Sequence, residues 1–260
     1  MQTQCDISLI AGYKSRSQQA RVISEGWLSS YGYCLNCDSN KLQATRANTK
    51  ARDFLCPRCH HPYELKSKSR THGGIVQDGA FESMMERIRA SEAPSLFLLA
   101  YNESWRVTNL HAIHSLFLTA NVVLKRNPLS LSAQRREWVG CNIAVKFIPP
   151  EGRIPLIING CVVSPAIART QFRRGNSLGE LKPAQRGWTA LTLALLRLLN
   201  MREFTLADAY QLESQFAQHY PSNRHIRAKI RQQLQILRDL KYLEFLGSGR
   251  YRIVQAARPA

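Results

Sequence analysis

Two Cys-x-x-Cys pairs place the strongest constraint on what this chain can fold into. Cys34 and Cys37 form the first pair and Cys56 and Cys59 the second, which gives the pattern C-x2-C-x18-C-x2-C. Two such pairs at this separation are typical of a tetrahedral zinc site with four thiolate ligands. Four protein ligands leave no position for water, so the sequence predicts a structural Zn²⁺ ion that holds two loops together.

The remaining cysteines point to the cellular compartment. Cys5, Cys141 and Cys161 stand alone, and a total of seven cysteines does not suit a disulfide framework. The start of the chain, MQTQCDISLI, lacks the basic and then apolar pattern of a signal peptide. The chain also holds no run of apolar residues long enough to span a membrane. We therefore expect a cytoplasmic protein in a reducing environment.

The segment PYELKSK, directly after the second cysteine pair, predicts a catalytic strand. With a period of two, Glu64 and Lys66 project to one face while Leu65 points to the core. If residues 51–55 form the antiparallel partner strand, with the cysteine pair as the turn, Asp53 lies beside Glu64. Two carboxylates and the main-chain carbonyl of Leu65 then make an oxygen-lined site for Mg²⁺. A lysine at this place can orient the attacking water, lower its pKa or stabilise the transition state.

This D…ExK layout is that of the PD-(D/E)xK nucleases, but it leaves alternatives open. Acidic and basic residues also alternate on solvated strands, and Arg52 stands where a proline often precedes the first aspartate. A second nuclease class, the zinc-containing HNH enzymes, needs a histidine base near the cysteine pairs. His60 and His61 fit that role poorly, because they follow the last cysteine directly and lead into the strand. They are interpreted as surface residues or phosphate contacts.

Charge points to a polyanionic partner. The chain carries 36 Lys and Arg against 18 Asp and Glu, a formal net charge of +18, and its pI is about 10.1. Neutralising phosphates with such a surface releases counterions, which favours nucleic acid. A ribosomal or membrane-surface protein is the other class with this charge. An apolar content of 44% predicts packed cores rather than a basic disordered tail.

Elements of both types are predicted in residues 1–180. Helices are expected at 15–31 and from Gln77 onward, the second capped by Asp78 and burying Ala80, Met84 and Ile88. The remaining apolar segments predict strands, at 95–101, 105–110, 141–148 and 153–158. Strands, a helix and further strands indicate an α/β or α+β domain.

A boundary is expected within 173–187, where Gly, Pro and charge cluster. Beyond it, residues 181–260 predict a small second domain with three helices and a hairpin around Gly247-Ser248-Gly249. The helices fall at 187–200, 204–218 and 222–243. This order is that of a winged helix-turn-helix domain.

The third of these helices is the natural element for the DNA major groove. Its apolar stripe leaves an opposite face of residue types that read guanine and adenine edges, namely Asn223, Arg224, Arg227, Arg231 and Gln235. Lys241, Arg250 and Arg252, on or beside the hairpin, are better placed for the phosphate backbone. A DNA-binding regulator with this domain, a zinc site and no catalysis is the alternative, and it would not need Asp53, Glu64 and Lys66.

Several motifs together make the chain similar to the DpnI family of methyl-directed restriction endonucleases. The motifs are YKSRSQQAR, both cysteine pairs, ELKSK, DGA with the following Met-Met, REWVGCNI, RGWT, EFTL, KIRQQLQILRD and GRYR. The resemblance runs nearly end to end. It implies a PD-(D/E)xK domain with structural zinc, followed by a winged helix, acting as a monomer on double-stranded DNA with N6-methyladenine in GATC. It also implies that Trp138 lies near the methyl groups. A core tryptophan is the alternative, but the neighbouring Arg135 and Arg136 favour a surface loop that faces DNA, because a core turn would not carry two unpaired charges.

Overall fold

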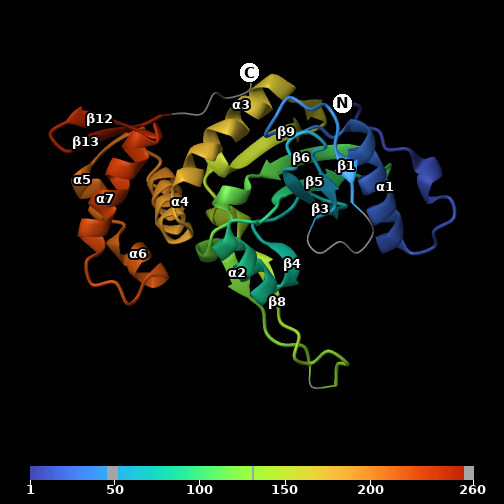
Figure 1. Cartoon of the computed structure of the whole chain (residues 1–260), viewed down its shortest axis with the longest axis horizontal. Helices are drawn as coiled ribbons and strands as arrows, with labels where there is room; N and C mark the ends of the chain where they lie inside the picture. Colours follow the sequence, from blue (N-terminus) through green and yellow to red (C-terminus); the bar gives the residue numbers. More distant parts are fainter. Residues whose placement is uncertain (46–51, 131, 255–260) are drawn as a thin grey trace.

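A seven-stranded sheet forms the centre of the N-terminal domain in the computed structural model, which describes residues 1–45, 52–130 and 132–254 (Figure 1). The strand order is β1-β2-β3-β5-β6-β9-β10, with β3 and β5 parallel and the other pairs antiparallel. The strands are β1 (Gln43–Ala44), β2 (Phe54–Leu55), β3 (Pro62–Lys68), β5 (Ser95–Tyr101), β6 (Val107–Ile113), β9 (Arg153–Ile158) and β10 (Cys161–Val162). All seven residues of β5 are buried, which confirms the strand predicted at 95–101.

Two helices cover one face of this sheet. The first, α1 (Arg16–Tyr31), confirms the predicted helix and buries Ile23, Trp27 and Leu28 against β5 and its neighbours. The second, α3 (Pro165–Gly175), packs Ala168 and Phe172 into the same core. This helix was not predicted, and it continues into a 3-10 turn at Asn176–Glu180. The segment expected to be a linker is therefore largely helical.

A small second sheet and a helix lie against the opposite face. The sheet has the order β4-β8-β7, formed by β4 (Val76–Ala80), β8 (Gly140–Ile143) and β7 (Val123–Lys125). The helix α2 (Phe81–Ala90) follows β4 directly and buries Met84 and Ile88, as predicted. The predicted cap is wrong: Ala80 is the N-cap, and Asp78 lies on β4. Pairing of β4 with the distant β8 makes this stretch a strand rather than the start of a helix.

The strand predicted at 141–148 is also shorter than expected. It ends at Ile143, and Val145–Phe147 form a 3-10 turn. The strand at 153–158 is confirmed as β9.

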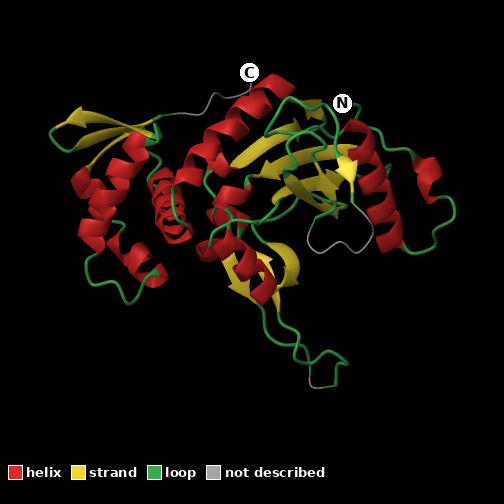
Figure 2. Ribbon diagram, viewed as in Figure 1, coloured by secondary structure: helices red, strands yellow, loops and turns green. Residues whose placement is uncertain are grey.

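The C-terminal part has the expected winged helix-turn-helix architecture (Figure 2). Its elements are α4 (Pro183–Leu198), β11 (Glu203–Thr205), α5 (Leu206–Tyr210), α6 (Glu213–His219), α7 (Ile226–Asp239), β12 (Leu243–Gly247) and β13 (Arg250–Ile253). The helix predicted at 204–218 is split into α5 and α6. The predicted hairpin gains β11 as a third strand, paired with β13. Positive φ angles at Gly247, Ser248 and Gly249 form its turn.

Helix α4 joins this domain to the N-terminal domain. Its apolar side chains belong to a core that continues from Leu96 and Leu98 of the central sheet to Ile253 of β13. Polar contacts reinforce the junction: Arg197 on α4 pairs with the buried Glu151, and the Asn121 amide donates to the Tyr220 hydroxyl at 2.7 Å. The two parts therefore share one continuous apolar core. Within the part of the chain that the structure describes, we find no helix that could cross a membrane.

Candidate active site and metal centre

The four paired cysteines come together at the turn of the β2–β3 hairpin. Their sulfur atoms all lie within 4.8 Å of one another, with Cys34 and Cys59 at 3.6 Å and Cys37 and Cys56 at 3.5 Å. Sulfur atoms around a tetrahedral zinc ion are about 3.8 Å apart, given Zn–S bonds of about 2.3 Å. The cluster therefore has the dimensions of a zinc site.

Main-chain amides prepare these sulfur atoms for a cation. The amide of Cys37 donates to Cys34 Sγ at 3.3 Å, and those of Arg58 and Cys59 donate to Cys56 Sγ at 3.4 Å. Burial raises the pKa of Cys56, but hydrogen bonds from Cys59 and Arg58 outweigh it and lower that pKa to about 6. Amides that stabilise a thiolate also suit a metal-bound thiolate.

Two arginines of α3 hold the first cysteine loop in place. Arg169 donates to the carbonyl oxygens of Cys34 and Ser39 at 3.0 and 2.9 Å, and to the Asn40 side chain at 2.9 Å. Arg173 pairs with Asp38 at 2.5 Å at a more exposed place. Neither arginine was predicted from the sequence, because the helix that carries them was missed.

Asp53 lies beside β3, at the place that the sequence predicted. Phe54 pairs with Tyr63 in the β2–β3 hairpin, and the amide of Asp53 donates to the Tyr63 carbonyl at 2.9 Å. The Asp53 carboxylate accepts a hydrogen bond from the Leu65 amide at 2.8 Å through Oδ2. The strand is shorter than the predicted 51–55, because β2 covers only Phe54–Leu55 and residue 51 lies outside the described residues.

Glu64 and Lys66 project to one face of β3, where a third carboxylate joins them. The Lys66 ammonium contacts Glu64 Oε1 at 2.5 Å and Asp78 Oδ1 at 2.6 Å. All three side chains are largely enclosed, with 19% of Lys66, 13% of Glu64 and 4% of Asp78 exposed. Sequence reasoning assigned Asp78 to a helix cap. Asp78 belongs to the DGA motif that supports the family resemblance, but the motif does not indicate a contact with Lys66, because that contact depends on the second sheet.

The electrostatics of this cluster favour a further cation. Burial, opposed by Lys66 and assisted by Asp78 and Asp53, raises the pKa of Glu64. Burial lowers the pKa of Lys66, but Glu64 and Asp78 outweigh it, so the net shift is upward. Two carboxylates contact the one ammonium group and Asp53 lies beside them, while Glu64 Oε2 is buried with no hydrogen-bond partner among the described residues. An orphaned carboxylate oxygen beside Asp53 fits a hard divalent cation, with the Leu65 carbonyl as a further oxygen on the same strand.

His61 is partly buried, whereas it was predicted to be a surface residue or a phosphate contact. Its Nε2 lies 2.9 Å from Ser95 Oγ, and its ring packs against Tyr63 and Phe172. Burial lowers the pKa of His61 to about 4. His60 is exposed. The contact of His61 with Ser95 and its lowered pKa do not suit the general base of an HNH nuclease.

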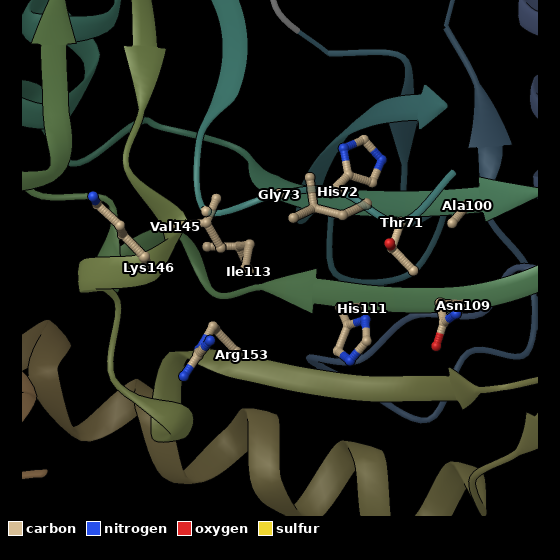
Figure 3. A pocket seen from close by; sticks show the side chains of 12 residues that line it. Thr71, His72, Gly73, Ala100, Asn109, His111, Ile113, Val145, Lys146 and Arg153 are labelled. Carbon is tan, nitrogen blue, oxygen red and sulfur yellow. The ribbon is translucent and has the colours of Figure 1, made fainter. Parts of the chain in front are cut away.

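Figure 3 shows a cavity of about 260 Å³ lined in part by His72, His111 and Arg153. The strand register places it on the same face of the sheet as Glu64 and Lys66. Leu98 lines it and pairs with Lys66 on one side and His111 on the other. The ionisable side chains in its wall are His72, His111, Lys146 and Arg153. This face is therefore basic beyond the carboxylate cluster, which suits a polyanionic substrate.

The face of α7 predicted to read DNA is solvent-exposed. Arg224, Arg227, Arg231 and Gln235 are exposed, while Ile226, Ile230, Leu234 and Leu237 are buried, as predicted. Arg227 forms an ion pair with Glu213 at 2.7 Å and lies over the Tyr210 ring. The side chain of Asn223 accepts a hydrogen bond from the His225 amide at the start of α7. Arg231 and Gln235 thus extend from the middle of the helix, and Asn223 helps to shape its start.

The wing carries the remaining predicted basic residues. Lys241 and Arg250 are exposed. Arg252 is held between Glu203 and Glu244, at 2.9 and 3.0 Å. The carboxylates neutralise Arg252 in the DNA-free protein, so its contact with a phosphate would require it to leave them.

Trp138 lies just before β8, near the end of the segment that joins β7 to β8. Its ring packs against Gly140, where an added Cβ atom would lie 2.7 Å from it. The guanidinium of Arg135 lies over the ring, 5.6 Å from its centroid, and Arg135 and Arg136 are exposed. Trp138 is half-buried rather than enclosed in the core.

Comparison with known families agrees with this geometry. The family model described as "DpnI: Dam-replacing family" matches residues 1–181, which include the cysteine cluster, Asp53, Glu64, Lys66 and Trp138. The chain belongs to the Dam-replacing family. A second model, "Dam-replacing HTH domain", matches residues 184–253. Membership in the Dam-replacing family with this HTH domain supports a methyl-dependent restriction enzyme that binds DNA.

Proposed function

We propose that this protein hydrolyses phosphodiester bonds of double-stranded DNA at GATC sites whose adenine carries an N6-methyl group. The observation that supports this most strongly is the Lys66 ammonium held against Glu64, beside Asp53, in a member of the Dam-replacing family. A regulator without catalysis has no use for this cluster, because enclosing three carboxylates and one ammonium costs desolvation free energy.

The residues that would hold Mg²⁺ are Asp53, Glu64 and the carbonyl of Leu65. A bound Mg²⁺ supplies an activated water for attack on phosphorus and stabilises the charge that develops. Lys66 donates a hydrogen bond to the attacking water or to a phosphoryl oxygen, since its ammonium lies next to Glu64. The four clustered cysteines hold Zn²⁺ in a structural role, keeping Asp53 in register with Glu64 across the hairpin.

Recognition of the site is divided between the two domains. In this proposal Arg224, Arg227, Arg231 and Gln235 of α7, with Asn223, approach base edges in the major groove. Arg250 and Arg252 of the wing contact the backbone. Trp138, flanked by Arg135 and Arg136, supplies the apolar surface for a methyl group, which contributes roughly 1 kcal/mol from buried area.

The proposal also includes the domain boundary near residue 180, the cellular compartment and the oligomeric state. Residues 1–180 form the nuclease domain and 181–260 the winged helix, although the two share an apolar core through α4. We place the protein in the cytoplasm, because none of its seven cysteines forms a disulfide, which suits a reducing compartment. A monomer is what the resemblance to the DpnI family implies.

Digestion of one plasmid, prepared from adenine-methylating and non-methylating hosts, tests the proposal. With Mg²⁺ the protein should cut the methylated plasmid into the fragments that its GATC sites define, and it should leave the other plasmid intact. Lys66→Ala should abolish cutting while retaining binding to methylated DNA. Lys41→Ala removes an exposed lysine elsewhere and should cut as the wild type does.

Three results would contradict the proposal. These are equal cutting of both plasmids, cutting that persists when divalent cations are removed, and wild-type cutting by Lys66→Ala.

A further inference from the structure

Asp78 is the residue of the catalytic cluster that neither the strand motif nor the hairpin explains. Its carboxylate contacts Lys66 at 2.6 Å, nearly the same distance as the contact between Lys66 and Glu64. It is the most enclosed of the three side chains, with 4% of it exposed. A carboxylate in such a place must be paired to be tolerated, and Lys66 is the partner that it has in this structure.

The backbone around Asp78 is shaped to present this carboxylate. Asp78 pairs with Cys141 and Ala80 pairs with Gly140, so Gly79 is an extra residue in β4 and forms a bulge. Bulges re-aim side chains next to active sites. Because β4 belongs to the small sheet and β3 to the large one, Asp78 reaches Lys66 from a different layer of the protein.

The two carboxylates that contact Lys66 should respond differently when a divalent cation binds. Glu64 has a buried Oε2 without a partner and lies beside Asp53, so a cation between them draws Glu64 toward itself. Asp78 approaches Lys66 from the other sheet and keeps its contact. An ammonium that retained only the metal-bound Glu64 would lose half of its charge-assisted hydrogen bonds.

We propose that Asp78 is a positioning residue that holds the Lys66 ammonium in place once Glu64 is engaged by the metal. This inference rests on the proposed nuclease function and identifies a part of the same site. Asp78 does not touch the substrate or the metal in this account; it acts through Lys66. Misplacing a catalytic group by about 1 Å costs on the order of 100-fold in rate, which sets the expected effect.

Replacing Asp78 by asparagine tests the proposal, because the amide has the same shape but no charge. Asp78→Asn should lower the single-turnover rate about 100-fold. Its affinity for methylated DNA and the Mg²⁺ concentration for half-maximal rate should not change. Asp78→Glu restores the carboxylate and should recover part of the rate. The matched control is Glu86→Gln, which neutralises an exposed acid on the adjacent α2 and should behave as wild type.

A second readout does not depend on cleavage. In protein with ¹⁵N-labelled lysine, bound to methylated duplex with Ca²⁺ in place of Mg²⁺, the Lys66 ammonium should give a sharp NMR signal, assigned by its loss in Lys66→Ala. The signal should persist in Asp78→Glu and disappear in Asp78→Asn through exchange with water. Should Asp78→Asn melt at a lower temperature than wild type, Asp78→Ser serves as the second variant with the same expectation.

The results that overturn the inference are separate from those that overturn the nuclease function. Asp78→Asn that cuts at the wild-type rate, or that keeps the Lys66 signal, would remove the positioning role. A loss of Mg²⁺ affinity as large as that of Glu64→Ala would make Asp78 a metal ligand instead. A wild-type protein that does not cut methylated DNA would refute the nuclease function, whereas the NMR signal would still decide the role of Asp78.

Discussion

Arg169 holds the loop of the first cysteine pair, residues 34–40, which we call the zinc loop. Replacing Arg169 by alanine should destabilise this loop far more than replacing Arg173. Arg169 is half-buried and donates three hydrogen bonds to the loop, at 2.9 to 3.0 Å, and its guanidinium lies 4.9 Å from the Tyr33 ring centroid. Hydrogen bonds from a charged donor contribute about 1.5 kcal/mol each, and a cation–π contact about 0.5 kcal/mol. Partial exposure reduces this sum, so we expect a loss of about 3 kcal/mol.

Arg173 provides the matched control. It donates one longer, exposed hydrogen bond to the loop, to the Asn36 carbonyl at 3.2 Å. Its pair with Asp38 is also exposed, with 41% and 70% of the two side chains accessible, and such pairs contribute about 0 to 1 kcal/mol. Urea unfolding of the zinc-loaded protein measures both losses, and the rate of zinc release to a chromogenic chelator reports on the loop itself. Equal losses for the two variants, or a loss below about 1 kcal/mol for Arg169→Ala, would refute the reasoning.

Three further outcomes are expected. Cys56→Ser should bind less than one zinc ion per chain, with activity falling in step with the folded fraction, whereas the exposed Cys161→Ser should keep both its zinc and its activity. Metal analysis and cleavage assays compare the two variants, and a fully active Cys56→Ser would make the zinc site dispensable. Burial lowers the pKa of His114 to about 4, so between pH 6.5 and about 4 this histidine is protonated in the unfolded chain but not in the folded one. The free energy of unfolding should therefore fall as pH drops through this range, and it should fall less steeply in His114→Gln. Parallel pH curves for the two proteins in urea unfolding would exclude this role. Trp138→Ala should cut methylated sites more slowly while α7 preserves the binding preference for methylated duplex, and a lost preference in binding assays would place methyl recognition in the nuclease domain.

The cysteine cluster and its hairpin could be predicted from the sequence because their information is local. The four cysteines, Asp53 and Glu64 lie within a short stretch of chain, and the second cysteine pair is itself the turn that sets Asp53 opposite Glu64. The apolar stripe of α7 was equally readable, because burial at helical spacing repeats over several turns.

Features that depend on distant partners were missed. An aspartate before an apolar helix is a typical N-cap, and only the pairing of β4 with β8, some sixty residues later, makes Asp78 a strand residue. Helix α3 buries only Ala168, Phe172 and Gly175, so its periodicity was weak beside the charged segment that follows. The contacts of Arg169 with the zinc loop span more than a hundred residues, and no local pattern indicates them.

The most direct test of the account is single-turnover cleavage of a short duplex with one GATC site, compared between its N6-methylated and unmethylated forms. With Mg²⁺ present, the wild-type protein should cut the methylated duplex at both strands and leave the unmethylated duplex uncut over the same period. Lys66→Ala should bind the methylated duplex and cut neither. Equal rates on the two duplexes, or no cutting of either one by zinc-loaded wild-type protein, would contradict the account.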